Sequence, residues 1–451
     1  MKKTALACIA LLSIALLSIA LTGCAQPTEQ TAEPTISPKI PANQPLTIYQ
    51  ATDIHYLSNT LTDGKKAFKT YLATGDGKQQ NYITEITDAF VDDVKAQKPD
   101  VLVLSGDITN NGEKVSHEEM AEKLEDIEKA GVQTYVIPGN HDVSNPYARK
   151  FEGDKQIKAE DITPKEFASI YHNSGYDEAV MRDDSTLSYL ATTSSDVWLL
   201  MVDTADYENN KRYGAPETNG YISTETFAWI QECIDLAKKH GAELVTVTHH
   251  NLLDHSELLT KGFTIVQNKE AVSLFAKNDI PLNLSGHVHI QDIRSETSHD
   301  RTIYDVATSS MAMYPQQYGV VNYVPNKGLS YKTQRVDVEK YARKINSKDP
   351  NLLGFQQYSK AYFGQFSYTK ALSDLFITGK YDPDDVEEMA KTMEQVNFAY
   401  FTGDKSFLNG VEKTPGYALW QKADGEFMTQ YIDYIVAHKS KNDLTLEIPE
   451  S

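Results

Sequence analysis

Residues 133–142 read QTYVIPGNHD: a five-residue run that is mostly apolar, a Pro-Gly pair, and then three polar side chains. A short run rich in β-branched and aromatic residues and closed by such a pair is typical of a buried strand. The side chains of Asn140, His141 and Asp142 follow it directly. The pattern therefore predicts a strand over 133–137 that presents amide, imidazole and carboxylate groups at its carboxyl end.

Four further segments repeat this arrangement of an apolar run followed by carboxylate or imidazole groups. The runs cover 47–52, 101–105, 243–248 and 281–285, and the polar residues that follow them are Asp53, His55, Asp107, His249, His250, His287 and His289. One such segment arises easily by chance, but six of the chain's 12 histidines fall within the five segments. Because ligands bind at the carboxyl edge of α/β sheets, we expect the five segments to form one site.

Segments with helical periodicity separate the strand-like runs. The expected helices cover 81–97, 117–130, 224–240 and 265–277, and further strand-like runs cover 187–193, 197–203, 302–308 and 329–336. Ser116 with Glu119 matches a capping box, which predicts the start of the second helix. Alternation of this kind is typical of an α/β domain with sheets at its centre, and we place this domain at 47–330.

The pattern changes near residue 337, where strand-like runs give way to helical periods with many aromatic residues. Asp382-Pro383 predicts the start of one helix, because proline is favoured at the first helical position. We therefore expect a C-terminal α-helical domain over 331–451. Its aromatic residues are expected in a core against the α/β domain, with ligand stacking by some of them as the alternative.

The first 24 residues have the layout of a secretory signal, with a basic start and a long apolar run. The run ends in LTGC at residues 21–24, which resembles the bacterial lipobox. This predicts a lipoprotein signal peptide over 1–23, a lipid on Cys24 and a Pro/Thr-rich tether over 24–46. The protein would then be exported and anchored on the extracytoplasmic side of a bacterial cell membrane. A plain membrane-spanning anchor is the alternative.

The composition excludes several classes of protein. The 451 residues include 43 Lys and Arg against 63 Asp and Glu, a formal net charge of −20 that becomes −22 once Lys2 and Lys3 are cleaved off. Such an acidic chain is unsuited to coating a nucleic-acid polymer. Three cysteines in so long a chain exclude a disulfide scaffold. Cys233 lies on the apolar face of the helix expected over 224–240 and is predicted to be a buried thiol.

The donor types in the five polar segments point to metal ions. Carboxylate, amide and imidazole groups without thiolate suit Mn, Fe or Zn rather than Cu(I). The segments hold more donors than one ion uses, and a carboxylate can bridge two ions about 3.5–4 Å apart, which clamp phosphoryl oxygens during an in-line displacement. The expected cofactors are two divalent or trivalent ions, Mn or Fe in the first place and Zn as the alternative.

The order Asp-x-His, Gly-Asp, Gly-Asn-His-Asp, His and Gly-His-x-His over residues 53–289 resembles the calcineurin-like metallophosphoesterase superfamily. The resemblance implies a two-sheet β-sandwich flanked by helices. It also implies phosphoester hydrolysis by a hydroxide held between two metals.

The same resemblance implies a role for each matching residue. Seven would be metal ligands: Asp53, His55 and His289 at one ion, Asn140, His249 and His287 at the other, and Asp107 as the bridge. His141 would be a catalytic residue that faces the phosphate and stabilises charge or protonates the leaving oxygen. Asp142 would orient His141.

The blocks around Asp107 and Asn140 look like the branch that contains class III cyclic-nucleotide phosphodiesterases. This implies a small phosphoester substrate, a nucleotide in the first place, and leaves the oligomeric state open. Within enzymes, the alternatives are a phosphomonoesterase or nucleotidase and a cell-envelope phosphodiesterase. Outside enzymes, the alternative is a surface-binding lipoprotein with a vestigial site.

Some residues near the motifs have weaker support. Segment 143–185 is expected to overhang the site, and His250 is interpreted as a neighbour of the metal ligands or a substrate contact. The candidates for stacking on a base are Tyr147, Tyr213, Tyr314 and Tyr318. The histidines interpreted as ordinary surface or helix residues are His117, His172, His240, His255, His299 and His438.

Overall fold

The computed structural model describes residues 36–423 and 427–450. The signal peptide predicted over 1–23 and the lipidation site predicted at Cys24 lie outside this part of the chain. None of the helices in the described part is long and apolar enough to cross a membrane.

Residues 36–46, predicted as part of a tether, contact the folded region. The backbone N–H of Ser195 donates to the carbonyl of Ile40 at 2.9 Å. The backbone N–H of Asn43 donates to the Asp196 carboxylate at 2.6 Å. These two hydrogen bonds tie Ile40 and Asn43 to a loop some 150 residues further along the chain. The folded region therefore starts before residue 47, where the tether was predicted to end.

The first sheet has six strands in the order β15-β14-β13-β1-β2-β3. Their bounds are β1 Leu46–Ala51, β2 Val101–Ser105, β3 Gln133–Ile137, β13 Gln317–Val324, β14 Gly328–Arg335 and β15 Thr445–Pro449. β1, β2 and β3 are parallel, and the other neighbours are antiparallel. The three parallel strands therefore end at the same edge.

The second sheet has seven strands in the order β11-β12-β10-β9-β8-β7-β6. Their bounds are β6 Met181–Arg182, β7 Tyr189–Ala191, β8 Val197–Val202, β9 Glu243–Thr248, β10 Leu282–Ser285, β11 Asp292–Ser298 and β12 Arg301–Ala307. β8, β9, β10 and β12 are parallel. Leu104 and Ile137 of the first sheet share one buried core with Leu199 and Val306 of the second, which confirms the predicted two-sheet sandwich.

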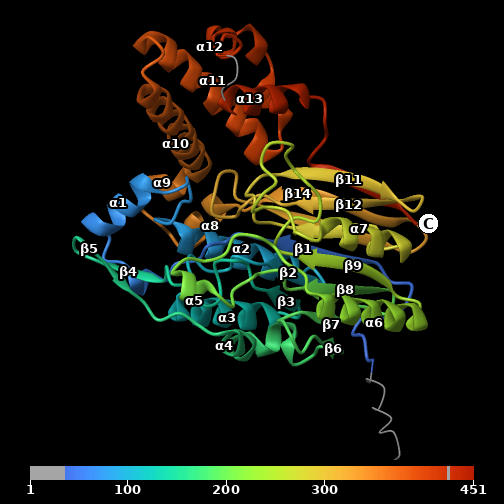
Figure 1. Ribbon diagram of the computed structural model, residues 1–451. Coiled ribbons are helices and arrows are strands. Elements are labelled where there is room, and N and C mark those ends of the chain that lie inside the picture. Colours follow the sequence, from blue (N-terminus) through green and yellow to red (C-terminus); the bar gives the residue numbers. More distant parts are fainter. Residues whose placement is uncertain (1–35, 424–426, 451) are drawn as a thin grey trace, which may run out of the picture. The chain divides into compact units, whose positions relative to one another are not determined.

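Helices cover both sheets (Figure 1). Those packed on the first sheet are α2 Ile83–Gln97 and α3 Lys114–Glu128, and those packed on the second are α6 Thr224–His240 and α7 Asn268–Lys277. Shorter helical segments are η1 Asn59–Leu61, α1 Lys66–Thr74, α4 Pro164–Ile170, η2 His172–Tyr176 and α5 Asn210–Tyr213. As predicted, Cys233 is a buried thiol in α6.

The predicted capping box at Ser116 and Glu119 is wrong, because α3 already begins at Lys114. The Ser116 hydroxyl instead accepts a hydrogen bond from the backbone N–H of Ser58 at 3.0 Å. The Glu119 carboxylate accepts from the hydroxyls of Tyr56 and Ser58 at 2.7 and 2.6 Å. Both side chains therefore fix the loop after β1, the loop that carries the first predicted metal ligands.

Several strands were not predicted. The missed ones are β6, β11, β13, β15 and the hairpin of β4 Arg149–Glu152 with β5 Lys155–Lys158. β15 lies inside the region predicted to be helical and pairs antiparallel with β14. Of its five residues only Ile448 is buried, so it shows little apolar periodicity. Edge pairing of this kind rests on backbone hydrogen bonds, which a side-chain pattern does not reveal.

The remaining C-terminal chain is helical, as predicted (Figure 1). Its elements are α8 Val338–Lys344, α9 Pro350–Leu353, α10 Phe355–Thr378, α11 Pro383–Thr402, η3 Lys405–Leu408, η4 Val411–Lys413, α12 Pro415–Trp420 and α13 Phe427–Ala437. Pro383 occupies the first turn of α11 directly after Asp382, as predicted. Met389, Trp420 and Ile432 form the centre of a separate apolar core between these helices.

Candidate metal centre

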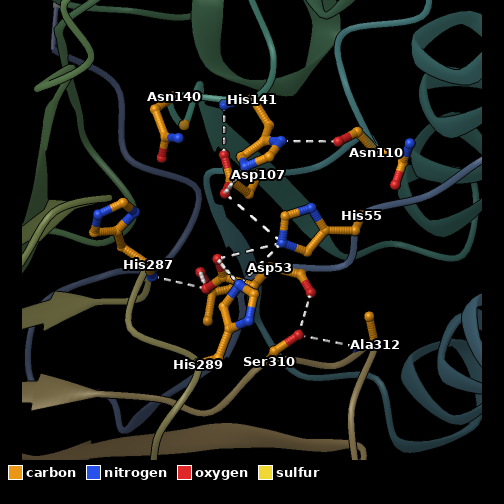
Figure 2. A network of polar contacts seen from close by, with 12 residues as sticks. Asp53, His55, Asp107, Asn110, Asn140, His141, His287, His289, Ser310 and Ala312 are labelled. Atoms are coloured by element: carbon orange, nitrogen blue, oxygen red, sulfur yellow. Dashed lines mark hydrogen bonds and ion pairs between the residues drawn. The ribbon is translucent and has the colours of Figure 1, made fainter. Parts of the chain in front are cut away.

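The five predicted polar segments meet at one place: Figure 2 shows side chains from four of them, and His249 of the fifth lies beside Asp107. β1, β2 and β3 of the first sheet and β9 and β10 of the second each end directly before one of them. Parallel strands share a carboxyl edge, so the turns that follow them converge. The structure thus brings together all seven predicted ligands, although their roles at a metal remain predictions.

The first group of donors consists of Asp53, His55, Asp107 and His289, with one donor atom of each lying within 4.8 Å of the others. His289 Nε2 lies 3.2 Å from Asp53 Oδ1. The Nε2 atoms of His55 and His289 lie 3.0 Å apart. His55 Nε2 is 3.7 Å from Asp107 Oδ2.

The second group consists of Asp107, His249 and His287. His249 Nε2 lies 3.4 Å from Asp107 Oδ2 and 3.1 Å from Asn140 Oδ1. His287 Nε2 lies 2.7 Å from the carbonyl oxygen of Gly262 and donates to it, which leaves Nδ1 as the donor available to a metal. Asp107 belongs to both groups, the arrangement expected of a bridging carboxylate.

The donors fit a pair of metal ions. Asp53 Oδ1 is buried, yet it accepts no hydrogen bond from any described residue. A buried carboxylate oxygen without a donor is costly unless a cation satisfies it. The close approach of two imidazole Nε2 atoms, on His55 and His289, has the same explanation, since both lone pairs can point to one ion.

The electrostatics favour positive charge at this place. Burial opposes protonation of His249, yet Asp107 and Asp53 outweigh it and raise the pKa of His249 to about 9. Burial would likewise raise the pKa of Asp107, but His249, His141 and His55 hold this pKa well below its usual range. Asp107 is therefore ionised in a site where it is almost fully buried.

The ligand backbones are strained. Five predicted ligands have φ between 48° and 68°, in the left-handed region: Asp53, His55, Asp107, His287 and His289. A non-glycine residue in such a conformation costs about 1–3 kcal/mol and persists only where its surroundings determine it. Strain of this kind is concentrated at functional sites.

Close packing also requires glycine beside the ligands. A Cβ at Gly139 would collide with Asp107 Oδ1 and come within 2.8 Å of His249 Nε2. A Cβ at Gly286 would collide with Thr52 Oγ1 and with the Asp53 carboxylate. The glycines of the motifs therefore allow the ligand turns to touch one another.

Asp53 is held by three further contacts (Figure 2). Its Oδ2 accepts from the Thr52 hydroxyl and from the backbone N–H of His287, both at 2.8 Å. Its carbonyl accepts from the Ser310 hydroxyl at 2.7 Å. Ser310 follows β12, and nothing in its sequence context singled it out.

His141 stands at the edge of the site. Its Nδ1 lies 2.9 Å from the Asn110 carbonyl oxygen and 3.0 Å from Asn111 Oδ1, so Nδ1 carries the hydrogen. Its Nε2 faces Asp107 Oδ2 at 4.0 Å (Figure 2), and the side chain is 26% exposed. The nitrogen of His141 that remains without a hydrogen-bond partner among the described residues is thus Nε2, which lies beside Asp107, the predicted bridging carboxylate.

Asp142 does not orient the ring of His141, contrary to prediction. Its Oδ2 accepts from the backbone N–H groups of Ile108 and Gly139 at 3.1 and 2.9 Å. Its Oδ1 accepts from the N–H and the hydroxyl of Thr109, both at 2.9 Å. Asp142 therefore joins the turns after β2 and β3, because its side chain points beneath the site. Asn110 and Asn111, which sequence reasoning missed, orient the ring.

Two histidines interpreted as ordinary residues are buried in polar networks. His117 Nδ1 lies 2.9 Å from the Tyr171 hydroxyl, and its Nε2 lies 2.9 Å from the Asp142 carbonyl, beneath the site. His255 Nδ1 lies 2.8 Å from Asp292 Oδ2, and its Nε2 lies 3.2 Å from Asp305 Oδ2. Their roles were missed because every partner but Asp142 lies outside a recognisable motif.

The His255 network links the sandwich to the C-terminal helices. Burial opposes protonation of His255, but Asp292 and Asp305 outweigh it and raise its pKa to about 8. The other titratable groups against this cluster are Arg294, Tyr400, Tyr434 and Lys441. Tyr434 of α13 donates to the His255 carbonyl at 3.2 Å.

The remaining candidates are the four tyrosines proposed to stack on a base and His250, and the structure places them differently. Tyr314 and Tyr318 are buried in aromatic clusters and are unavailable for stacking on a base, so that prediction is wrong for them. Tyr147 and Tyr213 are exposed. His250 packs against His287 with ring centroids 4.4 Å apart, and its Nδ1 lies 2.8 Å from the Thr204 hydroxyl.

Segment 143–185 contains the β4–β5 hairpin, which packs on α1 through Phe151 and Phe68. Its role over the site remains a prediction.

Comparisons with known proteins place the chain in a family. The family model for calcineurin-like phosphoesterases matches residues 46–291. A second model, described as the C-terminal domain of cyclic nucleotide phosphodiesterase, matches residues 337–442. The first model alone covers more than half of the chain.

A curated relative, a probable glycerophosphodiester phosphodiesterase (GpdQ) from Arcobacter nitrofigilis, is 44% identical over 55 residues. These residues are 12% of this chain and 19% of the relative, so the match spans about a fifth of the relative's length.

Solved structures with similar folds include a dimetal phosphatase from Danio rerio, 12% identical, covering 64% of this chain and 95% of that chain with a TM-score of 0.46. A putative 5'-nucleotidase from Staphylococcus aureus is 13% identical and covers 71% of this chain and 59% of that chain, with a TM-score of 0.39. These scores are too low to support a function. The family rests on the matched model: the chain belongs to the calcineurin-like phosphoesterases and carries the C-terminal domain described for cyclic nucleotide phosphodiesterase.

Proposed function

We propose that the protein is a metal-dependent phosphodiesterase. The observation that carries this proposal is the pair of donor groups that share the buried carboxylate of Asp107. When bound, two ions at such a site supply an activated water and neutralise charge on the phosphoryl group. Mn and Fe suit the oxygen and imidazole donors, with Zn as the alternative.

The chain's own residues would position and stabilise the reacting group. Asp107 and Asp53 provide the negative charge that retains the ions, and the strained turns hold the imidazoles in place. His141 holds its Nδ1–H on Asn110, so its Nε2 is directed towards the centre. In the protonated state this nitrogen can donate to a phosphoryl oxygen or to the leaving oxygen.

Cyclic nucleotides are the substrates that we propose first. The match of residues 337–442 to a domain described for cyclic nucleotide phosphodiesterase supports this choice. The short match to a probable glycerophosphodiester phosphodiesterase makes glycerophosphodiesters the second candidate. Both substrates are phosphodiesters, so the same chemistry serves either.

A substrate panel tests the proposal. The protein, loaded in turn with Mn, Fe and Zn, is offered 3',5'-cyclic nucleotides, glycerophosphodiesters, bis(4-nitrophenyl) phosphate and 4-nitrophenyl phosphate. We expect turnover of the diesters, with cyclic nucleotides preferred. Faster turnover of the monoester would favour a phosphomonoesterase or nucleotidase. If protein that contains two metals turned over none of these compounds, the proposal would fail, and a surface-binding lipoprotein with a vestigial site would be favoured instead.

We also propose that Cys24 carries a lipid and anchors the protein on the extracytoplasmic side of a bacterial membrane. The support is the LTGC ending of the apolar run at residues 21–24. Metabolic labelling with a fatty-acid analogue in a bacterial host would test it. We expect label on the wild type and none on Cys24→Ser; label on both would refute the site.

A further inference from the structure

The segment between β10 and β11 carries two of the predicted ligands, and its side chains divide between two environments. His287 lies in one donor group of the metal centre and His289 in the other (Figure 2). The residues that alternate with them, Val288 and Ile290, pack in the apolar core of the C-terminal helices. Ile290 is 3% exposed, and every other buried member of that core in the described chain lies between residues 371 and 436. The ligand segment therefore joins the metal centre to the helical core.

The next two residues of this segment are also held by the C-terminal region. Gln291 is buried, and its Nε2 donates to the carbonyl of Asp443 at 2.9 Å. A Cβ at Gly403, directly after α11, would lie 2.7 Å from Gln291 Cγ, so the backbone there touches this side chain. The Asp292 carboxylate accepts from Lys441 at 2.8 Å. Apart from His289, every residue from 288 to 292 therefore contacts the C-terminal region.

A second connection reaches His287 through the loop after β9. His287 Nε2 donates to the carbonyl of Gly262 in this loop at 2.7 Å. Nearer the start of the loop, the carbonyl of His255 accepts from the hydroxyl of Tyr434 of α13 at 3.2 Å. Leu258, between these two points, packs against the same helical core. The loop is thus fixed on the helices at one end and bound to a predicted ligand at the other.

The ligand turn needs support of this kind. His287 and His289 have φ of 68° and 60°. Residues other than glycine persist in this conformation only where their surroundings determine it. Residues that bind or orient the ligands of a metal also affect its binding, and losing one commonly weakens metal affinity about 10- to 100-fold. The C-terminal core provides such surroundings on the side of the turn that does not face the donors.

We infer that the C-terminal helical core positions His287 and His289 for metal binding, through residues 288–291 and through the loop over 255–262. This inference rests on the metal centre of the proposed function. It assigns the C-terminal region a role in metal binding, although none of the five sequence motifs lies there. Because coupling between two equilibria is reciprocal, bound metal should in turn stabilise the packing of the helices.

The first test compares Ile290→Ala with Met389→Ala. Both remove a buried apolar side chain from the same core, but Met389 lies about 16 Å along α11 from Tyr400, the residue of this helix that bonds the His255 carbonyl. Dialysis of the full chain against a series of free Mn²⁺ concentrations, with elemental analysis, measures metal affinity, and denaturant unfolding without metal measures stability. We expect both variants to lose stability. Only Ile290→Ala should bind both ions about 10-fold more weakly, and Ile290→Val should recover most of the affinity.

The second test removes one hydroxyl at a time from α13. Tyr434→Phe loses the hydrogen bond to the His255 carbonyl, whereas Tyr431→Phe loses one to Asn397 Oδ1, a bond of 2.9 Å within the helical region. We expect Tyr434→Phe to weaken one of the two ions about 2- to 10-fold, the range for one net hydrogen bond, because the loop reaches only His287. Tyr431→Phe should match the wild type. Neither change leaves a large cavity, so this pair serves even where a core truncation fails to fold.

The third test measures the reciprocal effect in the wild type. Hydrogen exchange of the backbone amides is recorded without metal and with saturating Mn²⁺. We expect bound metal to slow exchange in α11 and α13, because opening of these helices should disrupt the metal centre.

Equal Mn²⁺ affinity in Ile290→Ala and Met389→Ala would overturn the inference, and so would exchange in α11 and α13 that metal leaves unchanged. Equal affinity in the two tyrosine variants would refute the connection through the loop. A wild type that bound no metal would overturn both the inference and the proposed function. A wild type that bound two ions, showed these effects and turned over no phosphoester would refute the proposed function alone.

Discussion

Replacing Asp107 with asparagine removes the one carboxylate that both candidate metal groups share. The substitution keeps the size of the side chain, and Oδ1 can still accept from the backbone N–H of His141, a hydrogen bond of 2.8 Å in the structure. What changes is the negative charge at Oδ2, which lies 3.4 Å from His249 Nε2 and 3.7 Å from His55 Nε2.

The structure gives the size of the effect. Against the opposing effect of burial, Asp107 is the largest charge that raises the pKa of His249 from 6.5 to about 9. A pKa of about 9 in place of 6.5 corresponds to about 3 kcal/mol of stabilised positive charge, the net result of burial, Asp107, Asp53 and the Ser105 backbone. A metal cation beside the same carboxylate should lose a free energy of this order when the charge is removed. We therefore expect each metal to bind about 100-fold more weakly in Asp107→Asn.

Elemental analysis after dialysis at a series of free-metal concentrations measures this affinity, and turnover of bis(4-nitrophenyl) phosphate is recorded alongside. Asp183→Asn is the control, because it removes a buried carboxylate that binds Thr226 and Ser185, away from the metal centre. We expect two metals and normal turnover in the control. Two metals bound with wild-type affinity in Asp107→Asn would refute the bridging role.

Three further predictions follow from other parts of the site. His141→Ala should keep both metals, because the ring lies outside the donor groups, and should lower kcat about 10²- to 10⁴-fold; loss of metal would show that His141 is a ligand. Gly139→Ala should release metal and destabilise the protein by about 1–3 kcal/mol through overpacking, measured by denaturant unfolding. The control Gly354→Ala, whose added Cβ would meet no atom closer than 3.6 Å, should retain metal. Wild-type metal content in both variants would refute the close-packing argument. The raised pKa of His255 should contribute about 2 kcal/mol of stability below pH 6.5, and this contribution is lost as the pH rises through 8. The difference in unfolding free energy between wild type and His255→Gln should therefore shrink over that interval. A constant difference would contradict the assignment.

The predicted strands that carry the ligands were found because two signals coincide in them. Val101–Ser105 and Gln133–Ile137 are buried along their whole length in the structure, and their sequences are mostly apolar. Glycine and polar residues then mark the turn. β11 and β15 lack this signal, since most of their side chains are exposed or only partly buried. Their pairing is decided by neighbouring strands rather than by their own composition.

The contacts of individual side chains were harder to predict than the site itself. Asp142 was predicted to orient His141, yet its carboxylate binds the backbone of Ile108, Thr109 and Gly139. His255 had no motif around it, and its partner Asp305 lies 50 residues away. Hydrogen bonds of this kind depend on the directions of side chains, which a one-dimensional pattern does not record.

The sequence by itself determined that polar donors follow five strands and that no thiolate accompanies them, because burial and turn formation leave local signatures along the chain. The tertiary structure decided which donors meet at Asp107 and which nitrogen of His141 is free. It also decided the difference between Lys65 and Lys78. Each ends an Asp-Gly-Lys tripeptide, at 63–65 and at 76–78, but the Lys65 side chain is 71% exposed and that of Lys78 is 8% exposed. Local sequence sets what a segment can form, whereas packing against distant segments sets its burial and its charge environment.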